Sequence, residues 1–235
     1  MSPTAERRVR DLLLDALTVS SGAVDAISFL ALGKVFSAFM TGNVAFLGMG
    51  VAGATAPDAV AVLTAIVGFT AGVYASTRIV QPQEGAGTWP SRVTLALGIS
   101  LIAHAAFVGV WLASHGQPPT DTARVLLGAW ALAMGMQSGA IRALHVEGVF
   151  TTAATATLIY LAGDLSEWPA TAAERRRLAG VLVSLLVGAT AGSLLLLHAR
   201  IYAPVLPLVI TVAVVAAGAI ALPKRATDQG AGGLG

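Results

Sequence analysis

Long apolar stretches occupy most of this 235-residue chain, and the connections between them are short. A helix that crosses a lipid bilayer needs about 20 mostly apolar residues. The sequence predicts eight candidate segments, of which two are weaker than the others. The segments are residues 11–32, 36–54, 58–80, 91–113, 122–145, 149–164, 176–199 and 204–222.

The low charge content indicates the same class of protein. Only 11% of the residues are charged and 56% are hydrophobic, whereas a soluble domain carries about 25% charged residues. We therefore expect an all-α polytopic membrane protein with 6–8 transmembrane segments, forming a single membrane domain over residues 1–235. The Gly-rich residues 223–235 are predicted to be a disordered tail.

Composition also excludes several kinds of site. The chain has no Cys, which excludes disulfides and thiolate metal sites. Its net charge is +2 and its basic residues are scattered, so nucleic acid is not an expected partner. No sequence motif implies a metal or a cofactor.

An internal repeat runs through the chain. The run Val-Gly-Phe-Thr-Ala-Gly at 67–72 is matched by Val-Gly-Ala-Thr-Ala-Gly at 187–192. Two further matches follow the same order, and transporters are often built from two such related halves. The further matches join 22–26 with 139–143 and 36–43 with 150–157, which gives pseudo-symmetric repeats of about 11–113 and 122–222.

The two weak segments fall at corresponding places in the repeats. Segment 36–54 is interrupted by four glycines, and segment 149–164 is short and carries four threonines. Short or Gly-interrupted segments in matching positions point to a transporter binding site. They are either full crossings, broken helices or re-entrant hairpins, and non-helical backbone at membrane depth has to be buried or line a wet cavity.

The distribution of Lys and Arg bears on that choice, because basic residues collect on the cytoplasmic side. With eight crossings and cytoplasmic termini, nine of the 14 basic residues lie inside; with two re-entrant segments, eleven do. The difference slightly favours six crossings, which would make the halves inverted relative to each other. Eight crossings would make them parallel.

Polar residues within the apolar segments are the candidate binding residues. Asp25 is the strongest, because a carboxylate inside a membrane is costly and is retained for a partner, a cavity or a pathway. Arg142 is its counterpart in the repeat, and if the halves pack around a pseudo-twofold axis the two could pair directly; the alternative is that Arg142 anchors a helix end at the interface. The remaining candidates, which could equally be helix–helix packing contacts, are Thr41, Gly42, Asn43, Gln137, Thr155 and Thr157.

The chain resembles the YoaK family of bacterial membrane proteins. The resemblance rests on Gly-Ala-Val-Asp-Ala-Ile-Ser-Phe-Leu at 22–30, Phe-Met-Thr-Gly-Asn at 39–43 and Ala-Met-Gly-Met-Gln at 133–137. The family usually has glycine where this chain has Ala156, between Thr155 and Thr157. The resemblance implies a multi-pass protein of the bacterial inner membrane and suggests small-molecule transport.

We therefore expect a small-molecule secondary transporter or exporter, not an enzyme, with a site between its two repeats. The partners are the lipid bilayer and an unknown small molecule, and Gly-xxx-Gly faces could support a homodimer. One alternative is a channel or a structural subunit that acts with a partner. The other is an intramembrane hydrolase using Ser21 or Ser138 with His104, although its usual Gly-x-Ser-Gly motif is absent.

Overall fold

The computed structural model describes residues 2–81, 88–144, 146, 154–164 and 172–221. All regular structure within these ranges is helical, as the apolar pattern predicts. The predicted tail and the first residues of segment 149–164 lie outside the described ranges. The helices are α1 (Pro3–Ala31), α2 (Met40–Val51), α3 (Ala59–Val80), α4 (Ser91–Ala113), α5 (Thr120–Arg142), α6 (Ala154–Asp164), α7 (Ala172–His198), the 3₁₀ turn η1 (Arg200–Tyr202) and α8 (Val205–Ala221).

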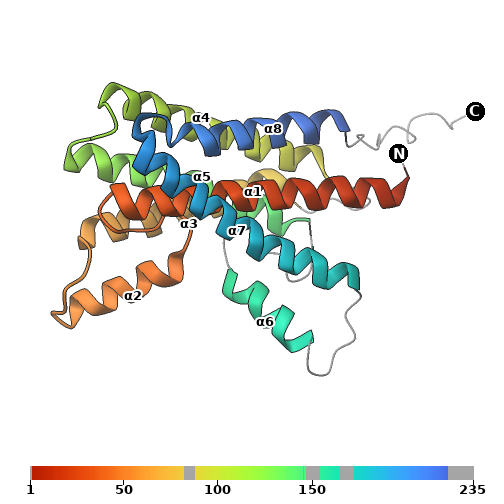
Figure 1. The fold of residues 1–235 in the computed structure, drawn as a ribbon, viewed down its shortest axis with the longest axis horizontal. Coiled ribbons are helices and arrows are strands. Elements are labelled where there is room, and N and C mark those ends of the chain that lie inside the picture. Colours follow the sequence, from red (N-terminus) through yellow and green to blue (C-terminus); the bar gives the residue numbers. More distant parts are fainter. Residues whose placement is uncertain (1, 82–87, 145, 147–153, 165–171, 222–235) are drawn as a thin grey trace, which may run out of the picture.

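Six of these helices are long and pack together as a bundle in which α7 crosses α1 obliquely, while α2 and α6 project from one side (Figure 1). Five helical stretches are long and apolar enough to cross a membrane: Thr4–Ala31, Ala59–Val80, Ser91–Ala113, Ala173–His198 and Arg200–Ile220. Helix α5 is as long as α4 but is less apolar, since it carries Gln137 and charges at both ends. It is also the most enclosed helix, and many of its residues are buried.

Two clusters of buried side chains give the directions of the helices. One cluster joins the C-terminal half of α1 to the N-terminal halves of α3 and α5, through Val24, Val62 and Leu127 among others. The other joins the N-terminal half of α1 to the C-terminal ends of α3 and α5, through Leu14 and Val80 among others. Helix α1 is therefore antiparallel to both α3 and α5.

Because of this antiparallel arrangement, the segment that contains α2 does not cross from one end of the bundle to the other. Helix α1 ends and α3 begins at the same end of the bundle, so the intervening residues 32–58 return to the side they came from (Figure 1). Helix α2 has 12 residues, so it is about 18 Å long, too short for a hydrocarbon core of about 30 Å. The described part of α6 has 11 residues. The sequence left six and eight crossings as alternatives, and the structure has six long helices. Helix α2 begins at Met40 rather than at residue 36, where the predicted segment starts.

Glycines hold two pairs of long helices at backbone contact. A side-chain carbon added to Gly72 of α3 would strike the Leu132 carbonyl of α5, and one added to Gly188 of α7 would strike the Val19 carbonyl of α1. Along each pair, later residues of one helix contact later residues of the other, so α3 is parallel to α5 and α1 is parallel to α7. These Gly-xxx-Gly faces pack within the chain; a role in dimerisation stays a prediction.

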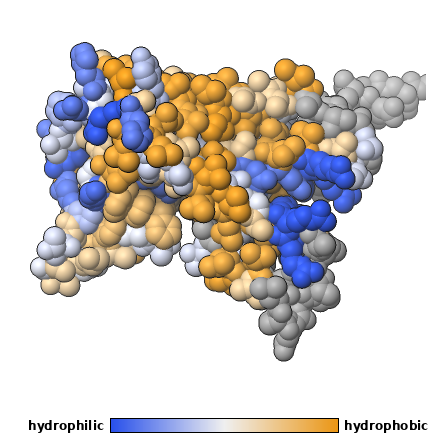
Figure 2. All heavy atoms as spheres, in the orientation of Figure 1, coloured by the Kyte–Doolittle hydropathy of each residue, from blue (hydrophilic) through white to orange (hydrophobic). Residues whose placement is uncertain are grey.

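The surface agrees with a membrane location. Figure 2 shows hydrophobic residues across the middle of the visible face and hydrophilic residues toward its two ends. Many large apolar side chains are exposed on the long helices, for example Leu186 at 68% and Ile102 at 70%. Within a bilayer such side chains face lipid rather than water, because a soluble monomer does not expose apolar surface on this scale.

Candidate functional site

The chain leaves α1 through a tight turn that brings it back against the same helix. Gly33 and Lys34 both have left-handed backbone angles, φ 94° and 64°. Glycine adopts that conformation freely, whereas a lysine does so at a cost. The turn directs residues 35–39 along α1 and toward the interior of the bundle.

Asp25 anchors this non-helical segment. Its Oδ1 atom accepts hydrogen bonds from the backbone N–H groups of Ser37 and Ala38, at 2.9 and 2.7 Å. A second tie joins the hydroxyls of Ser28 and Ser37 at 2.7 Å. Backbone groups inside a membrane need internal partners, so the carboxylate meets a requirement that the irregular segment creates. The intramembrane acid predicted from the sequence thus has a structural role at this position.

Asn43 fixes the neighbouring residue, Phe36. Its Oδ1 accepts from the Phe36 N–H at 3.0 Å, and its Nδ2 donates to the Phe36 carbonyl at 2.7 Å. The amide is fully buried, so this pair of bonds replaces the backbone partners that a helix would have supplied. Gly42 leaves room for the Phe39 ring, since an added side-chain carbon would lie 2.9 Å from it. Thr41 of the same helix is exposed.

Phenylalanines surround this segment. The rings of Phe29 and Phe36 are stacked with their centroids 4.8 Å apart, and Phe36 meets Phe39 edge to face at 5.3 Å. Phe46 of α2 lies on the other side of Phe36, at 6.1 Å. Four of the seven phenylalanines of the chain fall between 29 and 46. That clustering was the available sequence signal for an aromatic site, and reasoning from polar residues alone missed it.

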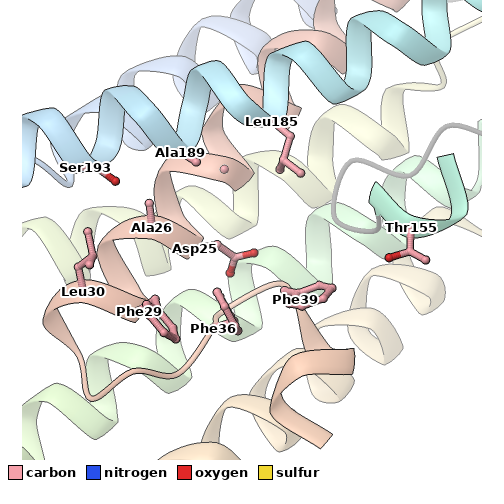
Figure 3. Close-up of a pocket in the computed structure, with 11 residues that line it drawn as sticks. Asp25, Ala26, Phe29, Leu30, Phe36, Phe39, Thr155, Leu185, Ala189 and Ser193 are labelled. Atoms are coloured by element: carbon pink, nitrogen blue, oxygen red, sulfur yellow. The ribbon is translucent and has the colours of Figure 1, made fainter. Parts of the chain in front are cut away.

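A pocket of about 480 Å³ opens beside Asp25. Figure 3 shows the carboxylate projecting from α1 toward Phe36, Phe39 and, across the pocket, Thr155 of α6. Among the described residues that line it, Asp25 is the only charged one. We call it the Asp25 pocket; its lining residues are Gly22, Asp25, Ala26, Phe29, Leu30, Phe36, Phe39, Thr155, Leu185, Ala189 and Ser193.

Close packing of α7 gives the pocket its far wall. Leu185, Ala189 and Ser193 of α7 line it. An added side-chain carbon on Gly22 of α1 would strike the Leu185 carbonyl and lie 2.9 Å from the Ala189 nitrogen. The small residue at 22 therefore allows α7 to approach α1, and both helices line the pocket.

The other predicted residues are distributed differently. Gln137 is buried in α5, and its Nε2 donates to the Leu17 carbonyl of α1 at 3.3 Å, which links two helices away from the pocket lining. Arg142 is the exposed last residue of α5, next to Ile141 of the second buried cluster. Asp25 adjoins Val24 of the first cluster, so the structure does not bring Asp25 and Arg142 together. Thr157 is buried on α6 and is outside the pocket lining.

Comparison with known proteins gives a family. Residues 13–217 match the family model described as "Protein of unknown function (DUF1275)". The chain is 33% identical over 162 residues to the UPF0700 transmembrane protein YoaK of Bacillus subtilis (strain 168), an alignment that covers 67% of this chain and 68% of that relative. No solved structure matches the chain. The resemblance drawn from the 22–30, 39–43 and 133–137 motifs is confirmed: the chain belongs to the YoaK family of multi-pass membrane proteins, the family of unknown function DUF1275.

Proposed function

We propose that this protein is a secondary transporter that binds a small molecule in the Asp25 pocket and couples its movement to a proton on the Asp25 carboxyl. One observation carries the proposal. Both short helices reach the same pocket at their N-terminal ends, since Phe39 directly precedes α2 and Thr155 lies in the first turn of α6. Broken or short segments that meet at a membrane-embedded site are typical of transporters.

The position of the acid supports proton coupling. A carboxylate within a membrane-crossing helix costs about 2.5 to 3.5 kcal/mol on insertion scales. Binding a proton or a substrate offsets that cost, so a carboxyl at this position is suited to alternate between the two. The described residues that line the pocket from the 36–39 segment, α6 and α7 include no other titratable side chain. Lys34, in the turn after α1, is the cation that contacts the lining residue Phe29. Any coupling in this pocket therefore centres on Asp25.

The helix pairing supports alternating access. Helix α1 packs on α7 and α8, whereas α5 packs on α3 and α4; contact between α1 and α5 is slight. The two groups have the same arrangement, in which α1 corresponds to α5, α7 to α3 and α8 to α4. Corresponding helices run in opposite directions, as expected for inverted halves. In this proposal the group of α1, α7 and α8 rocks against the group of α3, α4 and α5, and the Asp25 pocket opens to each side in turn.

The basic residues suggest an orientation. One end of the bundle holds the starts of α1, α4 and α7 and the ends of α3 and α5; the other holds the turn after α1, the start of α5 and η1. By the positive-inside rule the first end is cytoplasmic, which puts the N-terminus inside. The described basic residues at that end are Arg7, Arg8, Arg10, Arg78, Arg92, Arg142, Arg175, Arg176 and Arg177, against Lys34, Arg124 and Arg200 at the other.

Single-cysteine labelling tests the arrangement, and the Cys-free chain gives a clean background. Cysteines at Lys34, Pro57 and Ser91 are labelled in inverted and right-side-out vesicles with a membrane-impermeant maleimide. We expect positions 34 and 57 to label from outside and 91 from inside. Labelling of 34 and 57 from opposite sides would mean that α2 crosses, and the inverted arrangement would be abandoned.

Proton movement tests the function. Protein is reconstituted into liposomes containing a pH-sensitive dye, and panels of anions, neutral polar compounds and organic cations are added outside. We expect one class to drive proton movement that is lost in Asp25→Asn but kept in Asp15→Asn, a matched change on the same helix outside the pocket lining. If no class moves protons in an Asp25-dependent way, coupled transport is refuted; conductance indifferent to Asp25→Asn would favour a channel instead.

A further inference from the structure

The charge of the Asp25 pocket is one-sided. Of the lining residues that the structure describes, Asp25 alone is charged, and Thr155 and Ser193 contribute neutral hydroxyls. A bound anion would face a like charge at short range, and juxtaposed like charges oppose binding. A bound cation would instead find the counter-charge that an intramembrane carboxylate lacks.

The wall beside the carboxylate is aromatic. Phe29, Phe36 and Phe39 all line the pocket and contact one another in series. The face of an aromatic ring carries negative charge density and attracts cations within about 6 Å of its centre. Carboxylate and rings therefore favour the same sign of ligand (Figure 3).

The chain already places one of its own cations on this aromatic group. The ammonium Nζ of Lys34 lies 5.2 Å from the centre of the Phe29 ring. Lys34 holds a left-handed backbone, φ 64°, to make the turn that puts it there. Backbone of that kind is costly for a residue other than glycine and collects at functional positions. The contact shows that a face of Phe29 accepts an ammonium in this fold.

From these observations we infer that the Asp25 pocket binds a small organic cation, an ammonium carrying an apolar group, with its charge between Asp25 and the rings of Phe29 and Phe39. The inference rests on the proposed transport function of the same pocket and names its substrate class. A volume of about 480 Å³ falls within the range of ligand pockets. The apolar group would lie against Leu30, Leu185 and Ala189.

The backbone donors at the edge of the pocket, just before α2, are not open to an anion. The N-termini of α2 and α6 both face the pocket, and a helix N-terminus carries about half a positive charge. The N–H groups of Ser37 and Ala38, just before α2, already donate to Asp25 Oδ1. Those donors hold the carboxylate in place and are not available to a second anion.

Calorimetric titration of the purified full-length protein in non-ionic detergent tests the inference. The probes share a phenyl ring and differ in charge: benzyltrimethylammonium, benzyl alcohol and benzenesulfonate. We expect only the cation to bind. Asp25→Asn, whose amide oxygen can still accept from Ser37 and Ala38, should weaken cation binding about tenfold or more; Phe29→Leu should weaken it about 3- to 30-fold.

Two controls separate site effects from folding. Asp15→Asn and Phe69→Leu remove the same chemical groups from positions outside the pocket lining and should leave cation binding within about twofold. All variants are compared after gel filtration as single monodisperse peaks. Equal or tighter binding of benzenesulfonate or benzyl alcohol overturns the inference, as does cation binding that Asp25→Asn and Phe29→Leu leave unchanged.

The liposome experiment distinguishes failure of this inference from failure of the proposed function. Asp25-dependent proton movement driven by an anion or a neutral compound, without cation binding, overturns the cation site and leaves the transporter standing. Selective cation binding with no proton movement by any class supports the site and refutes coupled transport. Neither binding nor movement refutes both.

Discussion

The glycine seam between α3 and α5 gives the sharpest quantitative prediction about the fold. Gly72→Ala adds one methyl group, and that carbon would strike the Leu132 carbonyl of α5 and lie 2.8 Å from the Met136 nitrogen. These neighbours are backbone atoms, so relief requires moving a whole helix rather than turning a side chain. The matched control is Gly109→Ala on α4, where an added carbon meets nothing within 4 Å.

The magnitude follows from two opposing terms. Replacing glycine by alanine inside a helix is worth up to about 1 kcal/mol in propensity at either site. Overpacking costs about 1 to 3 kcal/mol, and backbone contact places Gly72 at the upper end of that range. We expect Gly72→Ala to lose about 2 kcal/mol and Gly109→Ala to gain up to about 1 kcal/mol. For a protein of this size the loss corresponds to a Tm lower by about 4 to 8 °C.

Thermal unfolding of detergent-purified variants, followed by intrinsic fluorescence and by loss of the monodisperse gel-filtration peak, measures this difference. Gly188→Ala on α7 should behave like Gly72→Ala, because its added carbon would strike the Val19 carbonyl of α1. If Gly72→Ala and Gly109→Ala unfold within about 1 °C of each other, which is less than 1 kcal/mol, the parallel α3–α5 seam described here is wrong.

Three further predictions concern single polar groups. Asn43→Ala removes both hydrogen bonds to Phe36 and should cost about 2 kcal/mol, seen as a lower Tm and as faster protease cleavage between α1 and α2; unchanged cleavage would contradict the role given to Asn43. His104 is buried, and neither ring nitrogen has a hydrogen-bond partner among the described residues. Relieving that desolvation is worth about 1 kcal/mol or more, so His104→Leu should raise Tm, and a fall would contradict this account of the buried imidazole. Desolvation opposes ionisation of Asp58, but hydrogen bonds from the Ala61 N–H and Arg124 outweigh it and lower the pKa of this carboxyl. The stabilisation of the folded state by Asp58 is therefore present above the unfolded pKa of about 3.9 and is lost as pH falls through the lower folded pKa. Because the Asp58–Arg124 pair is exposed, Arg124→Gln should change stability at pH 7 by less than about 1 kcal/mol, measured by thermal unfolding. A larger change would mean that the pair is shielded from solvent.

The candidate site could be predicted only in part. Asp25 and Thr155 were selected from their chemistry within apolar segments, and the structure has both lining one pocket. Asn43 was selected as a possible ligand, but its amide is taken up by the backbone of Phe36. The pairing of Asp25 with Arg142 assumed that equivalent residues of two repeats meet near one axis. Because α1 and α5 run in opposite directions and touch only slightly, the two residues lie apart.

Sequence alone determined that the chain is helical and membrane-embedded, and it located the long helices to within a few residues, except that α1 begins at Pro3 rather than near 11. Those properties depend on local composition, since about 20 apolar residues need a bilayer wherever their neighbours lie. Tertiary structure decided that residues 32–58 turn back, that the glycines of α3 and α7 face α5 and α1, and that rings from 29 to 39 enclose a carboxylate. Each of these depends on which helices meet and in which direction, and a hydrophobic pattern common to all the helices carries little information about the choice of partner.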